Sequence, residues 1–218
     1  MSDSTGLPTG TVLAVCVATD DVVLDRVGAS AIDKRPQTDR VRVGELGPTN
    51  DHVCDTKHHG GADQAVYAYS EPEAQRWARD LERDLPYGWF GENLRIDGMP
   101  ITDAIVGEQW AIGDDGLVVE TTIPRVPCRT FAAWADEPQW VKRFMDRADT
   151  GSYLRVVHVG TVGIGDVVRV VHRPTHGVRV RDLLAGTAAD ADALTALLAA
   201  DELAPKVRRE AERKLARV

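Results

Sequence analysis

The sequence predicts an α+β protein built around a barrel-like β-sheet, with inserted helices and a small helical extension at its C-terminal end. Short valine-rich strand patterns recur at irregular intervals up to Arg173, and helical patterns interrupt them without the regular alternation of a βαβ sheet. After Arg173 the composition shifts to alanine, leucine and charged residues. We therefore predict two parts, a barrel domain over residues 1–173 and a helical extension over residues 174–218.

The composition limits the class of partner and the compartment. The 218 residues carry a net charge of -8, which argues against a broad surface for nucleic acid or anionic membrane. Three widely spaced cysteines, Cys16, Cys54 and Cys128, indicate a reducing compartment rather than a disulfide framework. The acidic N-terminal segment lacks a basic signal region, and the apolar run from Val12 to Ala18 is too short to cross a bilayer. We expect a cytoplasmic protein.

The first half of the chain contains three strand patterns and a helix. Residues 9–20 are rich in valine and predict a buried strand, residues 40–43 alternate valine with arginine, and residues 65–70 are almost wholly apolar. Ser70 and Glu73 have the spacing of a helix capping box. The following helix is expected to bury one apolar face, made of Ala74, Trp77, Ala78, Leu81 and Leu85.

The second half continues with strands and ends in helices. Residues 109–122 predict two strands about the turn Asp115-Gly116, and residues 153–173 predict two more about a glycine-rich turn. Between them we expect one helix over residues 131–147. The extension predicts two or three short helices, with breaks at Gly186 and Pro205. Its last helix would bury Val207, Ala211 and Leu215.

Two histidines followed by two glycines are the first candidate for chemistry. Gly60 and Gly61 permit a backbone with positive φ, whose successive N–H groups can form a nest for an anion. His58 and His59 can donate hydrogen bonds to a phosphate or ligate a metal. A tight loop with a histidine as polar filler is the alternative. Together with Cys54, these histidines also have the ligand types of a zinc site, although no second ligand pair follows.

Cys128 is the most distinctive single residue. It lies in the segment PRVPC, where two prolines stiffen the chain and Arg125 and Arg129 flank the sulfur. Positive charge stabilises a thiolate, so this cysteine could be a nucleophile or a ligand for a soft metal. The alternative is a small buried residue without chemistry.

Two further segments contribute candidate binding groups. Lys34 and Arg35 are adjacent at a strand entrance and could hold a phosphate. The alternative is a solvated charge pair, which is the commoner arrangement for exposed charges. Asn93 follows an aromatic pair and a glycine, and its amide can donate to and accept from the edge of a heterocycle. A turn residue is the alternative for Asn93.

Five segments, in this order and spacing, together resemble the MOSC domain, a family named after the C-terminal domain of molybdenum cofactor sulfurases. The resemblance covers about residues 11–173 and extends to the bacterial stand-alone group that reduces N-hydroxylated purines and related compounds. The extension resembles the small three-helix segment of that group. The resemblance therefore implies a MOSC-type β-barrel with inserted helices. The segments are KRP from Lys34, KHHGGADQAVYAYS from Lys57, FGENL from Phe90, IGD from Ile112 and PRVPC from Pro124.

The resemblance also implies a cofactor and its site. It is the molybdenum cofactor, a pterin dithiolene (molybdopterin) that carries an oxo-molybdenum ion. By position, Cys128 matches the expected thiolate ligand of the metal. As our own hypothesis, either His58 or His59 donates the proton, and we take His59 as the catalytic residue beside Cys128. Cofactor binding is implied for residues from separate segments, namely Lys34, Arg35, His58, His59, Gly60, Gly61, Asp63, Asn93 and Arg125.

The implied activity is reduction of a small N-hydroxylated substrate, such as a hydroxylaminopurine, to the amine. The chain shows neither a dinucleotide fingerprint nor an iron–sulfur cysteine run, so electrons would come from a separate reductase. Nucleic acid and membrane are not expected partners, and the sequence leaves open whether the chain forms a homodimer. Two alternatives remain, a sulfur carrier with a persulfide on Cys128 and a binding module that holds the cofactor without turnover.

Overall fold

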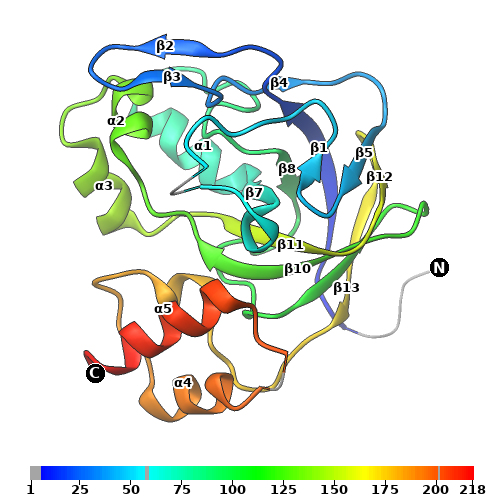
Figure 1. The fold of residues 1–218 in the computed structure, drawn as a ribbon, viewed down its shortest axis with the longest axis vertical. Coiled ribbons are helices and arrows are strands. Elements are labelled where there is room, and N and C mark those ends of the chain that lie inside the picture. The colour runs from blue at the N-terminus through cyan, green and yellow to red at the C-terminus, as the bar shows by residue number, and fades with distance from the viewer. Residues whose placement is uncertain (1–5, 57–58, 201) are drawn as a thin grey trace.

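A closed β-barrel is the centre of the molecule. The computed structural model describes residues 6–56, 59–200 and 202–218, and within them seven strands form a ring in the order β1-β13-β9-β10-β11-β7-β8, with β8 pairing back to β1 (Figure 1). This architecture confirms the predicted α+β barrel. The strands of the ring are β1 (Thr9–Val17), β7 (Val66–Ser70), β8 (Leu94–Asp97), β9 (Gln109–Ile112), β10 (Leu117–Pro124), β11 (Ser152–His158) and β13 (Val167–His172).

One pair in the ring is parallel, and a helix explains it. β7 and β8 run parallel, whereas the other neighbours of the ring are antiparallel. A parallel pair needs a crossover connection. Helix α1 (Glu71–Asp80) supplies it between the two strands, and all five residues of β7 are buried.

Short strands cover one end of the barrel. β2 (Val22–Leu24) and β3 (Gly28–Ser30) form a hairpin over that end, and β4 (Arg35–Pro36) pairs with the end of β1 (Figure 1). The other three short strands, β5 (Val41–Gly44), β6 (Gly47–Pro48) and β12 (Gly160–Val162), form a separate small sheet. These strands bring the chain from residue 28 to residue 56 across the mouth of the barrel.

Aromatic side chains fasten the inserted helices to one side of the barrel. α1 packs there with α2 (Arg129–Ala135) and α3 (Trp140–Arg147). The rings of Trp77 and Trp140 lie 4.7 Å apart between centroids, and those of Phe131 and Phe144 lie 5.2 Å apart. Because Phe131 is almost fully buried in this cluster, the start of α2 is held firmly against the barrel.

The C-terminal extension shares its core with the barrel. It contains one short 3₁₀ helix, η2 (Val180–Leu183), and the α-helices α4 (Ala191–Leu198) and α5 (Pro205–Leu215). Val207 and Ala211 of α5 are buried as predicted, and they belong to the same apolar cluster as the barrel interior. Pro205 begins a helix rather than interrupting one, which suits its fixed φ.

Two predicted elements are wrong in their extent. The helix expected over residues 131–147 is two helices, because Pro138 disfavours a helical residue before it and lacks the N–H that a continuous helix needs. The chain between them turns through left-handed residues at Asp136 and Gln139. Residues 153–173 contain three strands, since β12 leaves the ring to pair with β5.

The predicted capping box at the start of α1 does not form. Ser70 makes no capping hydrogen bond with its side chain. Glu73 is buried instead and accepts a hydrogen bond of 2.8 Å from the Thr102 hydroxyl. The helix also ends at Asp80, so Leu81 and Leu85 of the expected apolar face lie beyond it.

None of the helices in the described part of the chain has the length and apolar character needed to cross a membrane.

Candidate functional site

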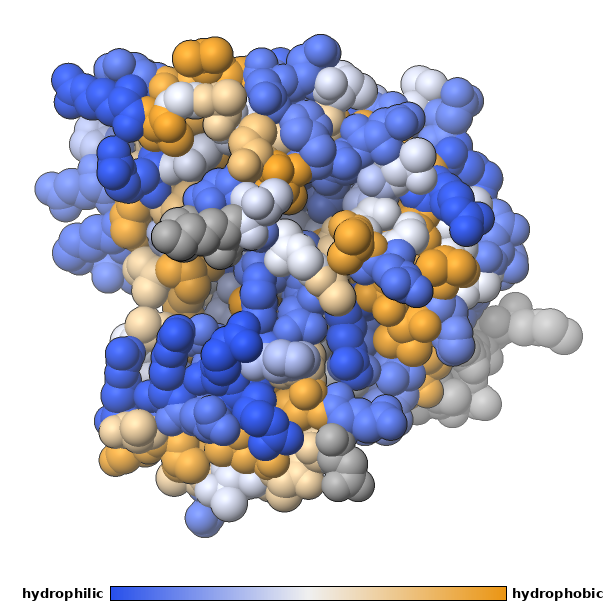
Figure 2. Space-filling view, in the orientation of Figure 1, coloured by the Kyte–Doolittle hydropathy of each residue, from blue (hydrophilic) through white to orange (hydrophobic). Residues whose placement is uncertain are grey.

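A cavity of about 660 Å³ opens at the end of the barrel that the short strands cover. Its lining comes from the β3–β4 region, the loop over residues 51–56, the loop that contains Gly60 and Gly61 (the glycine loop), and the segment around Cys128. Figure 2 shows the surface hollowed near the centre of this face, below the β2–β3 hairpin. The volume lies in the range of pockets for cofactors and small ligands. Segments far apart in the sequence therefore converge on one cavity.

Cys128 lies in the wall of this cavity. It directly precedes α2, and its side chain is partly exposed. Burial would raise the pKa of its thiol, but a hydrogen bond with His59 and the charge of Arg125 outweigh burial and lower the pKa to about 6. The cysteine is therefore mostly a thiolate at neutral pH.

Arg125 is a buried cation with unused hydrogen-bonding capacity. Its guanidinium stacks over the Phe131 ring, 3.8 Å from the centroid, and lies 5.6 Å from the Tyr67 centroid. Its Nη1 atom has no hydrogen-bond partner among the described residues, although Arg125 is only 6% exposed. A buried donor without a partner costs free energy, so an acceptor in the cavity would stabilise this arrangement.

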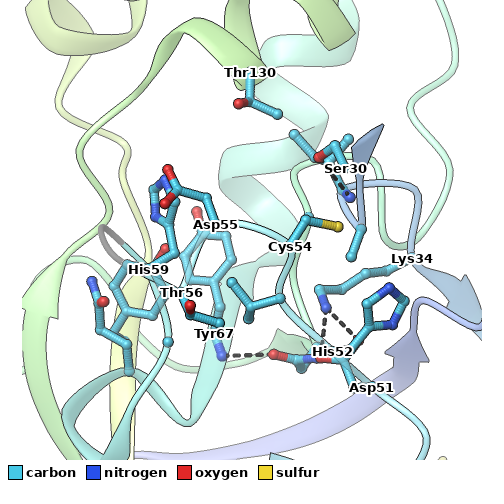
Figure 3. Close-up of a pocket in the computed structure, with 18 of the residues that line it drawn as sticks. Ser30, Lys34, Asp51, His52, Cys54, Asp55, Thr56, His59, Tyr67 and Thr130 are labelled. Atoms are coloured by element: carbon cyan, nitrogen blue, oxygen red, sulfur yellow. Dashed lines mark hydrogen bonds and ion pairs between the residues drawn. The ribbon is translucent and has the colours of Figure 1, made fainter. Parts of the chain in front are cut away.

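The glycine loop lines the same cavity. Gly60 and Gly61 adopt φ values of 74° and 81°, the left-handed region that favours glycine. His59 lines the cavity and hydrogen-bonds with Cys128, so the predicted meeting of this histidine and the cysteine is observed. His58 lies outside the described residues. Figure 3 shows His59 across the cavity from Lys34.

Lys34 and Asn93 line the cavity, but both are engaged with protein groups. The Lys34 ammonium lies 2.5 Å from Asp51 in an ion pair that is about nine-tenths buried (Figure 3). The Asn93 amide donates to Asp51 at 2.7 Å and to the Cys16 carbonyl at 3.1 Å, and its oxygen accepts from the Tyr67 N–H at 3.0 Å. Asp51 thus balances the charge of Lys34, and Asn93 joins the loop over residues 51–56 to β1 and β7.

Two candidates from the sequence lie away from the cavity lining. Arg35 is exposed and pairs with Asp33 at 2.6 Å. The Asp63 carboxylate accepts a hydrogen bond of 2.8 Å from the backbone N–H of Lys206, at the first turn of α5. Asp63 therefore caps a helix of the C-terminal extension.

Sequence reasoning missed two residues that shape the site. Asp51 had no signal, because its partners Lys34 and Asn93 are far away in the chain. The Lys206 ammonium reaches the glycine loop from α5, donating to the Gly60 carbonyl at 3.0 Å and to the Gln64 side chain. A lysine in the first turn of a basic helix could not be distinguished from a solvated charge by sequence alone.

Comparison with known proteins identifies the family. The profile of the MOSC domain matches residues 55–169. The uncharacterized protein YflK of Bacillus subtilis is 30% identical over 152 residues, which are 70% of this chain and 68% of that protein. A protein of Gibberella moniliformis described as a reductase is 29% identical over 148 residues, which are 66% of this chain and only 26% of that protein.

A solved structure supports the fold. The crystal structure of YiiM from Geobacillus stearothermophilus superposes with a TM-score of 0.75 over 94% of this chain and 99% of that chain, at 22% identity. The region that matches the family profile, residues 55–169, includes Gly60, Gly61 and the Cys128 segment. The chain therefore belongs to the MOSC domain family.

Proposed function

We propose that this chain binds the molybdenum cofactor in the cavity and reduces N-hydroxylated small molecules to amines. The observation that carries the proposal is that one cavity wall holds both the Cys128 sulfur and a buried Arg125 guanidinium, whose Nη1 has no hydrogen-bond partner among the residues that the structure describes. A soft anionic ligand and an unused donor side by side suit a metal that carries an anionic organic group.

The other residues of the cavity fit such a cofactor in part. Gly60 and Gly61 have the backbone conformation that lets main-chain N–H groups approach an anion closely. The charge of Lys34 is already balanced by Asp51, so Arg125 would supply most of the positive charge in the cavity. Arg35 and Asp63, which the family resemblance suggested, are the weakest members of the proposed set.

Each residue has a defined task in this proposal. The Cys128 thiolate would hold molybdenum, and Arg125 and the glycine loop would hold the phosphate and the pterin. When bound, the cofactor would supply a centre that exchanges two electrons and accepts an oxygen atom. His59, which hydrogen-bonds with Cys128, would keep a proton beside the reacting atoms. Tyr67 and Asn93, which are both buried, also line the cavity.

Family membership and one relative support a redox role. The Gibberella protein described as a reductase is about four times longer than the aligned region, so it contains further segments that this chain does not match. We infer that electrons reach this chain from a separate reductase and that the acceptor is a small molecule, as the cavity volume requires.

Metal analysis tests the proposal. The chain should be produced in a host that makes the molybdenum cofactor, and molybdenum should be measured by mass spectrometry together with reduction of an N-hydroxylated purine by a chemical electron donor. Wild type should hold about one molybdenum per chain, and Cys128→Ser should lose most of the metal and the activity. Arg125→Met should weaken cofactor retention.

Arg129→Met is the matched control, because Arg129 is exposed and donates a hydrogen bond to the Arg26 carbonyl, outside the cavity lining. Absence of molybdenum from wild type, or full reductase activity in Cys128→Ser, would overturn the proposal. A persulfide on Cys128 after treatment with a sulfur donor, without reductase activity, would instead favour a sulfur carrier. Tight cofactor binding without turnover would indicate a binding module.

A further inference from the structure

A second cluster of metal-ligating side chains lies at the mouth of the cavity, apart from Cys128. Asp21 follows β1, while His52 and Cys54 belong to the loop over residues 51–56. One ligand atom from each of the three lies within 4.8 Å of the others. In the described part of the chain this is the one group of three such residues that meets this spacing.

The ring of His52 has the orientation of a metal ligand. Its Nδ1 lies 3.0 Å from the Ala18 carbonyl oxygen. A carbonyl oxygen can only accept, so Nδ1 must carry the proton. Metal-bound histidines commonly donate their second ring N–H in this way, which fixes the tautomer and directs the other nitrogen to the metal.

The opposite ring nitrogen faces an anion. The Nε2 atom of His52 lies 2.6 Å from the Asp21 carboxylate. The Cys54 sulfur lies 3.2 Å from the same carboxylate oxygen. An imidazole lone pair and a carboxylate oxygen repel each other at this distance unless a cation, either a proton or a metal ion, lies between them.

The ligand types select among metals. A thiolate, an imidazole and a carboxylate are the ligands of tetrahedral Zn²⁺, whereas Mg²⁺ and Ca²⁺ prefer sets made of oxygen alone. All three side chains are exposed, so they can adjust by a few tenths of an ångström to zinc–ligand bonds of about 2.0–2.3 Å. The fourth position would face solvent and take a water molecule.

We propose that Asp21, His52 and Cys54 bind a divalent transition metal, zinc by preference, at a site separate from the cofactor cavity's Cys128. The ion would join the turn after β1 to the loop over residues 51–56, which forms one wall of the cavity and carries Asp51 (Figure 3). Asp51 already ties this loop to the Ala18 N–H at 2.9 Å. The metal would add a second connection one to three residues away from this hydrogen bond and hold Asp51 against Lys34.

This trio differs from the zinc ligands considered from the sequence, which combined Cys54 with His58 and His59. His59 turns to Cys128 instead, and His58 lies outside the described residues. Asp21 was not predicted, because the folding of the loop against the end of β1 is what brings it to Cys54 and His52.

Cobalt titration of cofactor-free protein tests the site without relying on the proposed reductase function. The chain should be purified with a chelator, freed of it, and titrated with Co²⁺, whose thiolate charge-transfer absorption reports a bond to sulfur. Wild type should give this absorption at about one equivalent of Co²⁺, and Zn²⁺ should displace it. Cys54→Ser should abolish the absorption, and His52→Gln should weaken Co²⁺ binding at least about tenfold.

Cys128→Ser is the matched control and should retain the absorption. Circular dichroism of each variant checks the fold, and since the three side chains are exposed, their replacement should leave it intact. The proposal is overturned if wild type gives no thiolate absorption, if Cys54→Ser keeps it, or if Cys128→Ser loses it. None of these outcomes depends on molybdenum, so failure here would leave the reductase proposal standing.

Discussion

At the residue level, local surroundings give the three cysteines different acidities. Burial, with Glu92 next, raises the pKa of Cys16 to about 12. Burial and then the neighbouring Asp21 raise the pKa of Cys54. Only at Cys128 do His59 and Arg125 overcome burial and lower the pKa. Three residues of one type therefore differ in reactivity because of the charges that tertiary structure places near them.

This difference predicts selective alkylation. In cofactor-free protein kept with a chelator, iodoacetamide at about pH 7 should label Cys128 before Cys54, although Cys54 is the more exposed. The rate of Cys128 alkylation should rise with pH and then level off, and the midpoint of this rise should lie near the pKa of about 6. His59→Ala should move this midpoint upward. Peptide mass spectrometry measures each site, with Cys54 as the internal control, and faster labelling of Cys54 would contradict the prediction.

At the element level, α1 contains a buried acid that couples stability to pH. Burial raises the pKa of Glu73 to about 7, against the opposing hydrogen bond from Thr102. The folded protein thus keeps this proton up to about pH 7, whereas the unfolded chain releases it near pH 4.5. The stability from Glu73 is fully present below the unfolded pKa and is lost as the pH rises through the folded pKa.

Replacement of Glu73 by glutamine should reveal this coupling. At about pH 8, wild type bears a buried charge that costs on the order of 3 kcal/mol, and Glu73→Gln should be more stable by a sizeable part of that amount. At about pH 5 the two proteins should differ little. Urea unfolding at both pH values gives the difference in the free energy of unfolding. Equal differences at the two pH values would show that Glu73 does not titrate with a raised pKa.

Helix α5 holds the glycine loop in place through hydrogen bonds of Lys206. Lys206 donates to the Gly60 carbonyl, and the Asp63 carboxylate accepts from the Lys206 N–H. Partial burial lowers the pKa of Lys206. A segment that looks like an appendage in the sequence therefore supports a wall of the site.

Removal of the Lys206 side-chain hydrogen bonds should increase the mobility of the glycine loop. Lys206→Met keeps the apolar stem but loses the two hydrogen bonds from Nζ to the loop, each worth about 1 kcal/mol. Amide exchange over residues 59–65 should therefore accelerate by about five- to thirtyfold. Arg208→Met is the control on the same helix, because Arg208 donates to the Leu198 carbonyl and not to the loop. If amide exchange is unchanged in Lys206→Met, or accelerates equally in both variants, Lys206 does not hold the glycine loop in place.

At the scale of the whole molecule, the barrel and the extension fold around one apolar core. Val178, Leu194 and Val207 of the extension belong to the same buried cluster as Val12 and Trp110 of the barrel. The division at residues 173 and 174, predicted from composition, therefore does not correspond to a gap in the packing. Two units that share a core are expected to unfold together.

Calorimetry can measure this cooperativity. The full chain should show a single unfolding transition with equal calorimetric and van't Hoff enthalpies. A chain ending at residue 173 should be much less stable, because the barrel would expose the apolar surface that α4 and α5 cover. Two separate transitions in the full chain would instead identify the extension as an independent domain.

Local sequence patterns determined much of the fold. A valine-rich run specified β1, an almost wholly apolar run specified β7, and a turn signal at Asp115-Gly116 specified the β9–β10 hairpin, because each depends on neighbouring residues alone. Pro138 also contained the information that splits the helix expected over residues 131–147. Motif order pointed to the family and to Cys128, His59 and Arg125, which do line one cavity.

Only the tertiary structure decided which groups of the site are free and which are engaged. Lys34 is balanced by Asp51, Asn93 bridges three segments, and Asp63 caps α5. These partners are separated by 17 to 143 positions in the chain. The physical reason is that electrostatic and hydrogen-bond partners are set by distance in space, and the closure of the barrel, rather than any local pattern, creates those distances.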